Sequence, residues 1–141
     1  MSPSSEDRES VLMSSPRVAG ASTGSVTMSW MIYYLCKTSS IKGKLVKELE
    51  AFFADNLDGS NPIPFTSLNK LSLLEAAEIE CLRMHPPIGY AMPRDTPAEG
   101  AVICGVYVPG GVAVGVPAAT IGRHPMVYKN PDQWLPERWS D

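Results

Sequence analysis

Apolar residues in the first part of the chain follow helical patterns. Nearly every position in the stretch 26–36 is apolar, which is typical of a helix surrounded by protein. Ser15 followed by Pro16 predicts its N-cap and first turn, because proline lacks the amide hydrogen that a first turn cannot use. We therefore expect a central helix over residues 16–37, after a mobile, serine-rich start over residues 1–15.

The next two stretches predict shorter helices. Apolar residues recur at helical spacing over 40–54 while lysines and glutamates take the other faces, which predicts an amphipathic, partly exposed helix. Polar and turn-forming residues predict a loop over 55–64. A third helix is expected over 68–84, because Pro86-Pro87 follows and proline disfavours a helical conformation at the residue before it.

Two apolar runs in the last third of the chain predict a β-hairpin. Residues 101–108 and 112–116 flank Pro109-Gly110-Gly111, which is typical of two strands joined by a tight turn. The second run alternates valine with alanine and glycine, so we expect close packing against the small-residue face that holds Gly115. Short helices and coil are expected over 117–141. The pattern as a whole predicts a mainly α fold with a β-hairpin region.

Composition limits the classes of function. The chain has 141 residues, 44% of them hydrophobic and 19% charged, which suits one packed domain. Its net charge of −3 argues against nucleic-acid binding. We find no predicted membrane-spanning helix, and the polar N-terminus lacks the apolar core of a signal peptide. The three cysteines stand in apolar settings and are interpreted as reduced core thiols: Cys36, Cys81 and Cys104.

A series of short motifs changes this picture. Alone, Glu80-x-x-Arg83 is a weak signal, since an acid and a base three residues apart on a helix usually form a solvated salt bridge. Here His85-Pro86-Pro87, Pro93-Arg94 and Pro136-Glu137-Arg138-Trp139 follow it in order. This order and spacing resemble the cytochrome P450 monooxygenases of fungal type, and the resemblance covers residues 18–141. It implies one partial domain over 16–141, a central-to-C-terminal fragment of the cytochrome P450 fold.

The resemblance implies a structural triad of Glu80, Arg83 and Arg138. One carboxylate has two oxygens, and two planar guanidinium groups can each donate to it. Arg138 is far from Glu80 along the chain, so only a fold could bring the two together. The alternative interpretation is three unrelated surface charges.

Two further positions resemble the family's cofactor and substrate contacts. By that resemblance Arg94 pairs with a haem propionate, where a fixed cation is needed opposite a buried carboxylate. The alternative is an ordinary exposed arginine. The loop Ile88-Gly89-Tyr90 resembles the segment that reaches over the haem and lines the substrate pocket. An apolar pair around a glycine suits small hydrophobic substrates.

The central helix resembles the family's oxygen-binding helix over residues 19–23. Gly20 permits a local break in the backbone ladder, and Thr23 can place a hydroxyl in the gap. Such a hydroxyl, with ordered water, can relay protons toward oxygen. Ser22 takes the place where the family usually has an acid. A small-residue packing face is the alternative for this stretch.

The family holds its haem iron through a cysteine in a Phe-x-x-Gly-x-Arg-x-Cys loop, a motif that these 141 residues do not contain. The resemblance therefore implies haem as the cofactor, which we do not expect this chain to retain alone. The implied parent inserts one oxygen atom from O2 into a small hydrophobic substrate. It takes electrons from an NADPH-dependent reductase, typically at the endoplasmic reticulum membrane. We expect a truncated, inactive chain; the alternative is a non-catalytic remnant or interaction module that binds no haem.

Overall fold

The chain divides into two compact units, residues 1–82 with 134–141 and residues 83–133. The computed structural model describes residues 5–56 and 63–140, with the backbone alone described for 5–18 and for Phe65. The architecture is mainly helical with two antiparallel sheets of two strands each, in agreement with the predicted fold class. Among the described helices, none has the length and apolar character needed to cross a membrane.

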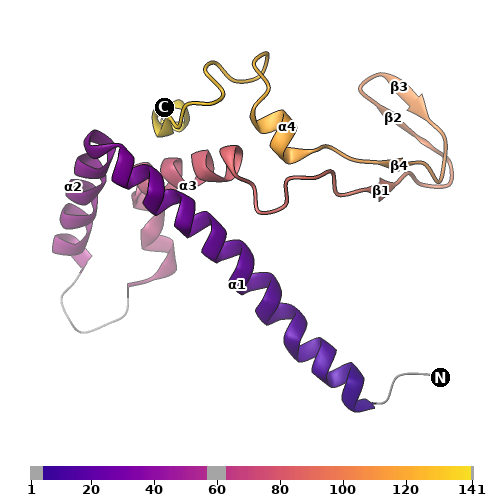
Figure 1. Cartoon of the computed structure of the whole chain (residues 1–141), viewed down its shortest axis with the longest axis horizontal. Coiled ribbons are helices and arrows are strands. Elements are labelled where there is room, and N and C mark those ends of the chain that lie inside the picture. The colour runs from indigo at the N-terminus through magenta and orange to yellow at the C-terminus, as the bar shows by residue number, and fades with distance from the viewer. Residues whose placement is uncertain (1–4, 57–62, 141) are drawn as a thin grey trace. The chain divides into compact units, whose positions relative to one another are not determined.

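The first unit begins with two successive helices, α1 over Ser5–Lys37 and α2 over Ser39–Asn56 (Figure 1). The predicted helix start at residue 16 is wrong, because α1 begins at Ser5 and continues through Pro16. A proline inside a helix removes one backbone hydrogen bond, crowds the preceding turn and costs about 3 kcal/mol, so the start at Ser5 runs against the local preference of Pro16. Residues 1–4 of the predicted mobile start, and 57–62 of the predicted loop, lie outside the described residues.

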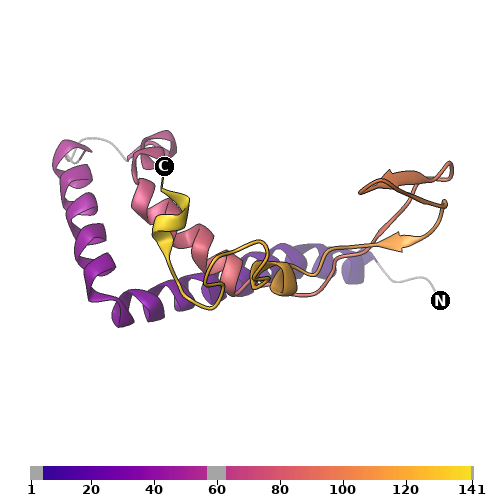
Figure 2. The ribbon, with the colours of Figure 1, turned by 90° about the horizontal axis from the view of Figure 1, so that it is seen from above.

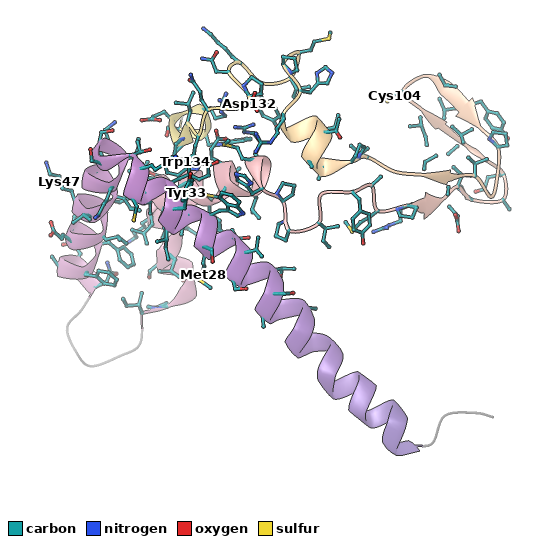
Figure 3. The ribbon with its side chains drawn as sticks, in the orientation of Figure 1. Met28, Tyr33, Lys47, Cys104, Asp132 and Trp134 are labelled. Atoms are coloured by element: carbon teal, nitrogen blue, oxygen red, sulfur yellow. The ribbon has the colours of Figure 1, made fainter. Side chains whose placement is uncertain are left out.

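Helix α2 is amphipathic, which confirms the prediction. Ile41, Leu45 and Phe52 are buried on one face, whereas Phe53 is 40% exposed. Helix α1 instead carries apolar side chains on several faces and leaves Met28 57% exposed in this chain (Figure 3). An all-round apolar helix is expected to be surrounded by protein, so α1 has more apolar surface than the described residues cover.

The third predicted helix is divided in two. A 3-10 helix, η1, spans Phe65–Lys70, and α3 spans Ser72–Met84. The prediction of one helix over 68–84 is wrong at its start, because Leu71 has non-helical dihedral angles (φ −90°, ψ 69°) that accompany burial of its side chain to 3% exposure. The predicted end at residue 84 is confirmed, just before Pro86.

The first unit's core lies where α2, α3 and the C-terminal segment meet. A last 3-10 helix, η2 over Pro136–Trp139, lies beside α3 in both ribbon views (Figures 1 and 2). The ring of Trp134 stacks on that of Tyr34, with centroids 5.3 Å apart and planes 8° from parallel (Figure 3). The unit's buried apolar side chains are Ile41, Leu45, Phe52, Leu71, Ala76, Ala77, Cys81 and Trp134.

The cysteines divide between core and surface. All three are free thiols, but only Cys81 is buried, while Cys36 and Cys104 are exposed. The interpretation as core thiols is therefore wrong for two of them. Cys36 lies on the all-round apolar α1, and Cys104 lies at a turn, where its φ is positive.

The strands of the second unit pair differently from the prediction. β2 (Ala101–Ile103) pairs with β3 (Val106–Val108), and β1 (Arg94–Asp95) pairs with β4 (Ala113–Val114), both antiparallel. The hairpin turn is thus Cys104-Gly105 rather than Pro109-Gly110-Gly111. Both turn residues have positive φ, 50° and 81°, which a two-residue hairpin loop of the favoured twist requires.

Buried Thr96 explains why residues 109–111 do not form the hairpin turn. Its Oγ1 donates to the carbonyl of Pro109 (2.6 Å) and accepts from the amide of Val112 (3.0 Å). Its carbonyl also accepts from the amide of Gly111 (3.1 Å). The segment is therefore held against Thr96 and leads into β4, after which the short helix α4 spans Ala118–Gly122.

Candidate functional site

A fully buried carboxylate anchors α3 to the C-terminal segment of the first unit. Glu80 has 0% side-chain exposure, and its Oε1 lies 3.0 Å from Arg138 Nε. The backbone amide of Leu135 also donates to Oε1 (2.9 Å), and the indole Nε1 of Trp139 donates to Oε2 (2.9 Å). Three donors from residues 135–139 thus converge on one carboxylate.

This arrangement is an electrostatic anchor. Removing a charge from water is costly, and the cost is offset only when a counter-charge and hydrogen bonds surround it. Glu80 has both, and Arg138 is itself only 15% exposed. Sequence reasoning paired Glu80 with Arg138 but missed Leu135 and Trp139. The Trp139 indole was a usable signal, because it stands next to Arg138 in the same motif and indole N–H groups commonly find a hydrogen-bond acceptor.

Arg83 lies three residues after Glu80 on α3 and belongs to the second unit. Its Nη1 donates to the carbonyls of Gly122 and Pro131 (2.8 Å to the latter), and its Nη2 donates to that of Gln133 (3.2 Å). The guanidinium also lies over the ring of Tyr128, 5.0 Å from its centroid. Arg83 therefore holds the segment 122–133 against the end of α3, and its predicted bond to Glu80 stays a prediction.

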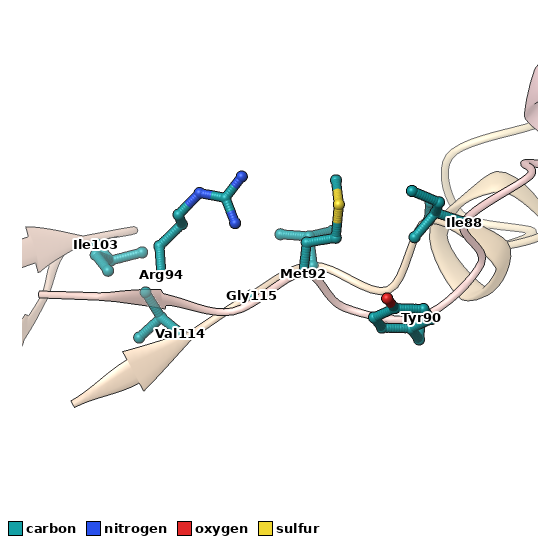
Figure 4. Close-up of a pocket in the computed structure, with 9 residues that line it drawn as sticks. Ile88, Tyr90, Met92, Arg94, Ile103, Val114 and Gly115 are labelled. Atoms are coloured by element: carbon teal, nitrogen blue, oxygen red, sulfur yellow. The ribbon is translucent and has the colours of Figure 1, made fainter. Parts of the chain in front are cut away.

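The second unit contains a pocket of about 460 Å³. Arg94 is the one charged residue among the described residues that line it. Figure 4 shows Arg94, Met92 and Ile88 on the same side of the ribbon. The lining residues are Ile88, Tyr90, Met92, Arg94, Ile103, Val114, Gly115, Val116 and Ala118.

Strand pairing positions the arginine in this pocket. Arg94 is opposite Val114 in the β1–β4 pair, so its backbone is fixed while its side chain extends over the pocket. Among the described residues its guanidinium donates only to the carbonyl of Pro93 (2.9 Å), which leaves donors for an anion. Apolar walls around one cation suit a flat apolar molecule that carries a carboxylate. These residues therefore fit a haem propionate.

Two glycines allow the close packing that shapes this pocket. A Cβ on Gly115 would lie 3.1 Å from Ala91 Cβ, which confirms the predicted close contact at the small-residue face. Gly89 is not among the lining residues. Its carbonyl accepts from the amide of Ala119 (3.0 Å), and a Cβ there would lie 3.1 Å from Ala119 Cβ. Of the predicted substrate loop, Ile88 and Tyr90 line the pocket, while Gly89 holds the loop against α4.

The predicted oxygen-handling residues lie on an unbroken part of α1. The helix continues through Gly20, where a Cβ would meet nothing within 4 Å. Thr23 Oγ1 donates to the carbonyl of Ala19 (2.7 Å), one turn earlier, and the carbonyl of Ser22 accepts from Ser25 Oγ (3.0 Å). The predicted proton relay through Thr23 and Ser22 stays a prediction.

In the part of the chain that the structure describes, titratable groups outside these contacts do not gather into a metal site. Among the described residues, no group of three or more His, Cys, Asp and Glu side chains could hold a metal ion. Burial, with Arg123 and then Arg83, lowers the pKa of His85, which suits a neutral structural imidazole. Burial raises the pKa of the Cys81 thiol to about 11, so this cysteine stays protonated at neutral pH.

The chain is similar to fungal monooxygenases. The cytochrome P450 monooxygenases aclL and astD of Aspergillus oryzae are each 34% identical to it, covering 86% and 95% of this chain and 24% and 25% of their own lengths. The fusicoccadiene 8-ol C-16-hydroxylase of Phomopsis amygdali is 37% identical and covers 85% of this chain and 22% of its own length. The chain thus spans about a quarter of the length of the curated relatives it matches.

A solved structure and a family model agree with these relatives. A zebra fish cytochrome P450, determined with progesterone, superposes with a TM-score of 0.64 at 26% identity, over 87% of this chain and 28% of that chain. The predicted fold, a fragment of the cytochrome P450 fold, is confirmed. The model described as cytochrome P450 matches residues 10–141, so the likeness begins upstream of residue 16, where we placed the boundary. The chain belongs to the cytochrome P450 family.

Proposed function

We propose that this chain is the part of a haem monooxygenase that holds one haem propionate and closes the fold around the cofactor. The parent would insert one oxygen atom from O2 into a small hydrophobic organic substrate, with electrons from an NADPH-dependent reductase. The observation that carries the proposal is the apolar pocket in which Arg94 is the one charged side chain among the described lining residues. The haem would supply the iron at which O2 is activated.

The chain's own residues would bind a haem propionate, contact the substrate and hold the surrounding elements in place. Arg94 would donate to a propionate, because a guanidinium and a carboxylate form short, charge-assisted hydrogen bonds. Ile88 and Tyr90 would present an apolar surface to the substrate. Glu80, held by Arg138 and Trp139, would keep the C-terminal segment against α3, so that the haem-facing elements keep their positions.

Thr23 would hold a water molecule that supplies protons. Its hydroxyl donates to Ala19, which leaves the oxygen lone pairs to accept a hydrogen bond from a water. We propose that such a water is the proton source during oxygen cleavage. Ser22 would contribute a hydroxyl where the resemblance implies an acid, so it could orient this water without supplying charge.

The test is haem occupancy of the complete parent protein with Arg94 changed to leucine or lysine. A charge-assisted pair is worth about 1.5–3 kcal/mol, so Arg94→Leu should weaken haem binding about tenfold or more. Arg94→Lys should retain part of the affinity, and Lys47→Leu, on the exposed face of α2, is the control. Haem content per chain is measured from the haemochrome spectrum after purification. Unchanged occupancy in Arg94→Leu would contradict the assignment of Arg94 to a propionate, whereas a parent protein that carries no haem with Arg94 intact would favour the remnant that binds none.

A further inference from the structure

The first turn of helix α3 donates hydrogen bonds to a carboxylate of another helix. Glu48, on α2, accepts from the backbone amide of Leu73 (2.9 Å to Oε1) and from that of Leu74 (3.1 Å to Oε2). The hydroxyl of Ser72 lies 3.3 Å from the same Oε1. All four residues belong to the first unit. One side chain that lies more than twenty residues upstream in the sequence thus accepts hydrogen bonds from the first turn of α3.

The break at Leu71 explains why α3 needs this partner. A helix leaves its first amide groups without intrahelical acceptors, and its N-terminal end carries a partial positive charge. Because η1 ends and α3 starts afresh at Ser72, these amide groups must bind elsewhere. A carboxylate satisfies two of them and matches the charge, as an N-cap side chain does within one helix.

The far part of α3 carries Glu80. An α-helix is stiff, and Glu80 lies about two turns beyond Leu73, so fixing the first turn also fixes where the Glu80 carboxylate stands. We propose that Glu48 is a positioning residue. By holding the start of α3 to α2, it places Glu80 so that Arg138, Leu135 and Trp139 can converge on it.

The neighbouring contact of α2 cannot replace this one. Lys44, one turn before Glu48, lies 3.7 Å from Glu137 of η2, but the two side chains are 64% and 50% exposed. Exposed ion pairs contribute little, because water and salt screen them and both side chains lose entropy. Glu48 is half-buried and bonds two backbone amide groups of α3, so it is the stronger of these two polar contacts of α2.

The test compares Glu48→Ala with Glu48→Gln in this chain, with Glu50→Gln as the control that removes a charge from the exposed face of α2. Backbone amide exchange at Leu73 and Leu74 measures the cap, and the NMR resonance of the Trp139 indole N–H measures the anchor at Glu80. We expect exchange about tenfold faster in Glu48→Ala, an intermediate effect in Glu48→Gln and none in the control. The indole resonance should shift in Glu48→Ala, because its acceptor moves.

A rescue variant keeps the test decisive where Glu48→Ala folds poorly. Ser72→Asp restores a negative charge at the start of α3 from within the helix, so adding it to Glu48→Ala should slow exchange again and return the indole resonance. Exchange that changes less than about twofold in both Glu48 variants would overturn the cap. Faster exchange with an unmoved indole resonance would overturn the positioning role.

The inference rests on the proposed function only for its consequence, that loss of Glu48 lowers haem occupancy in the parent protein. Both NMR readouts are made without haem. Failure of the Arg94 test would therefore leave the positioning role intact, and an unmoved Trp139 resonance would leave the Arg94 assignment intact.

Discussion

Replacing Arg138 by alanine should cost about 3 kcal/mol of folding free energy. The substitution leaves the fully buried Glu80 carboxylate with the Leu135 amide and the Trp139 indole as donors but without the guanidinium. Stranding one member of a buried pair costs about 3–5 kcal/mol, whereas exposed pairs are worth at most about 1 kcal/mol. Arg138 is 15% exposed, so water can partly replace it, which favours the lower end of the buried range.

The assay is urea unfolding of the chain, followed by circular dichroism, in a double-mutant cycle of Arg138→Ala and Glu80→Ala. The cycle isolates the coupling between the two side chains, which should be at least about 2 kcal/mol. Glu137→Ala, one residue away, is the control and should cost about 0.5 kcal/mol or less, because its ion pair with Lys44 is exposed. A coupling below about 1 kcal/mol would refute the anchor.

The remaining predictions concern Cys81 and Gly122. Because the pKa of Cys81 is about 11 in the folded chain against 9.0 unperturbed, its contribution to stability should fall as pH rises from 9 to 11. At pH 8 a disulfide reagent should modify the two exposed cysteines and reach Cys81 only in urea; equal rates for all three would contradict its burial. Gly122→Ala would place a Cβ against the backbone carbonyl of Arg83, so the urea midpoint should fall by the equivalent of about 2 kcal/mol. In Gly43→Ala, where a Cβ meets nothing within 4 Å, the midpoint should hold or rise, and a fall equal to that of Gly122→Ala would contradict the packing argument.

Local pattern was sufficient to predict most of the helical structure. The buried face of α2 follows from apolar spacing, because each of its buried residues points to one side of a regular helix. The hairpin illustrates where pattern fails. Pro109-Gly110-Gly111 and Cys104-Gly105 are both acceptable turn sequences, and the choice between them was made by the buried hydroxyl of Thr96. A contact across thirteen residues does not appear in any periodicity.

Some roles of the site residues were predicted from motifs, and others needed the structure. Glu80 and Arg138 were paired from motifs, and Arg94 was assigned from its place after Pro93, because a resemblance carries tertiary information that spacing alone lacks. Trp139 is the last residue of the Pro136–Trp139 motif, yet its role became clear only from the structure. There its indole N–H donates to Oε2 of Glu80. A motif names the residue types, but the acceptor of each donor is set by packing.

Both the helix break at Leu71 and the cap by Glu48 were missed from the sequence, and the two omissions have one cause. A continuous helix over 68–84 would satisfy its own amide groups at Ser72, Leu73 and Leu74, and would need no outside acceptor. The break at Leu71 exposes those groups, and only a break makes a distant carboxylate useful. Predicting the helix as unbroken therefore concealed the cap. The burial of Leu71 and the bonds to Glu48 must be established together, because each offsets the cost of the other.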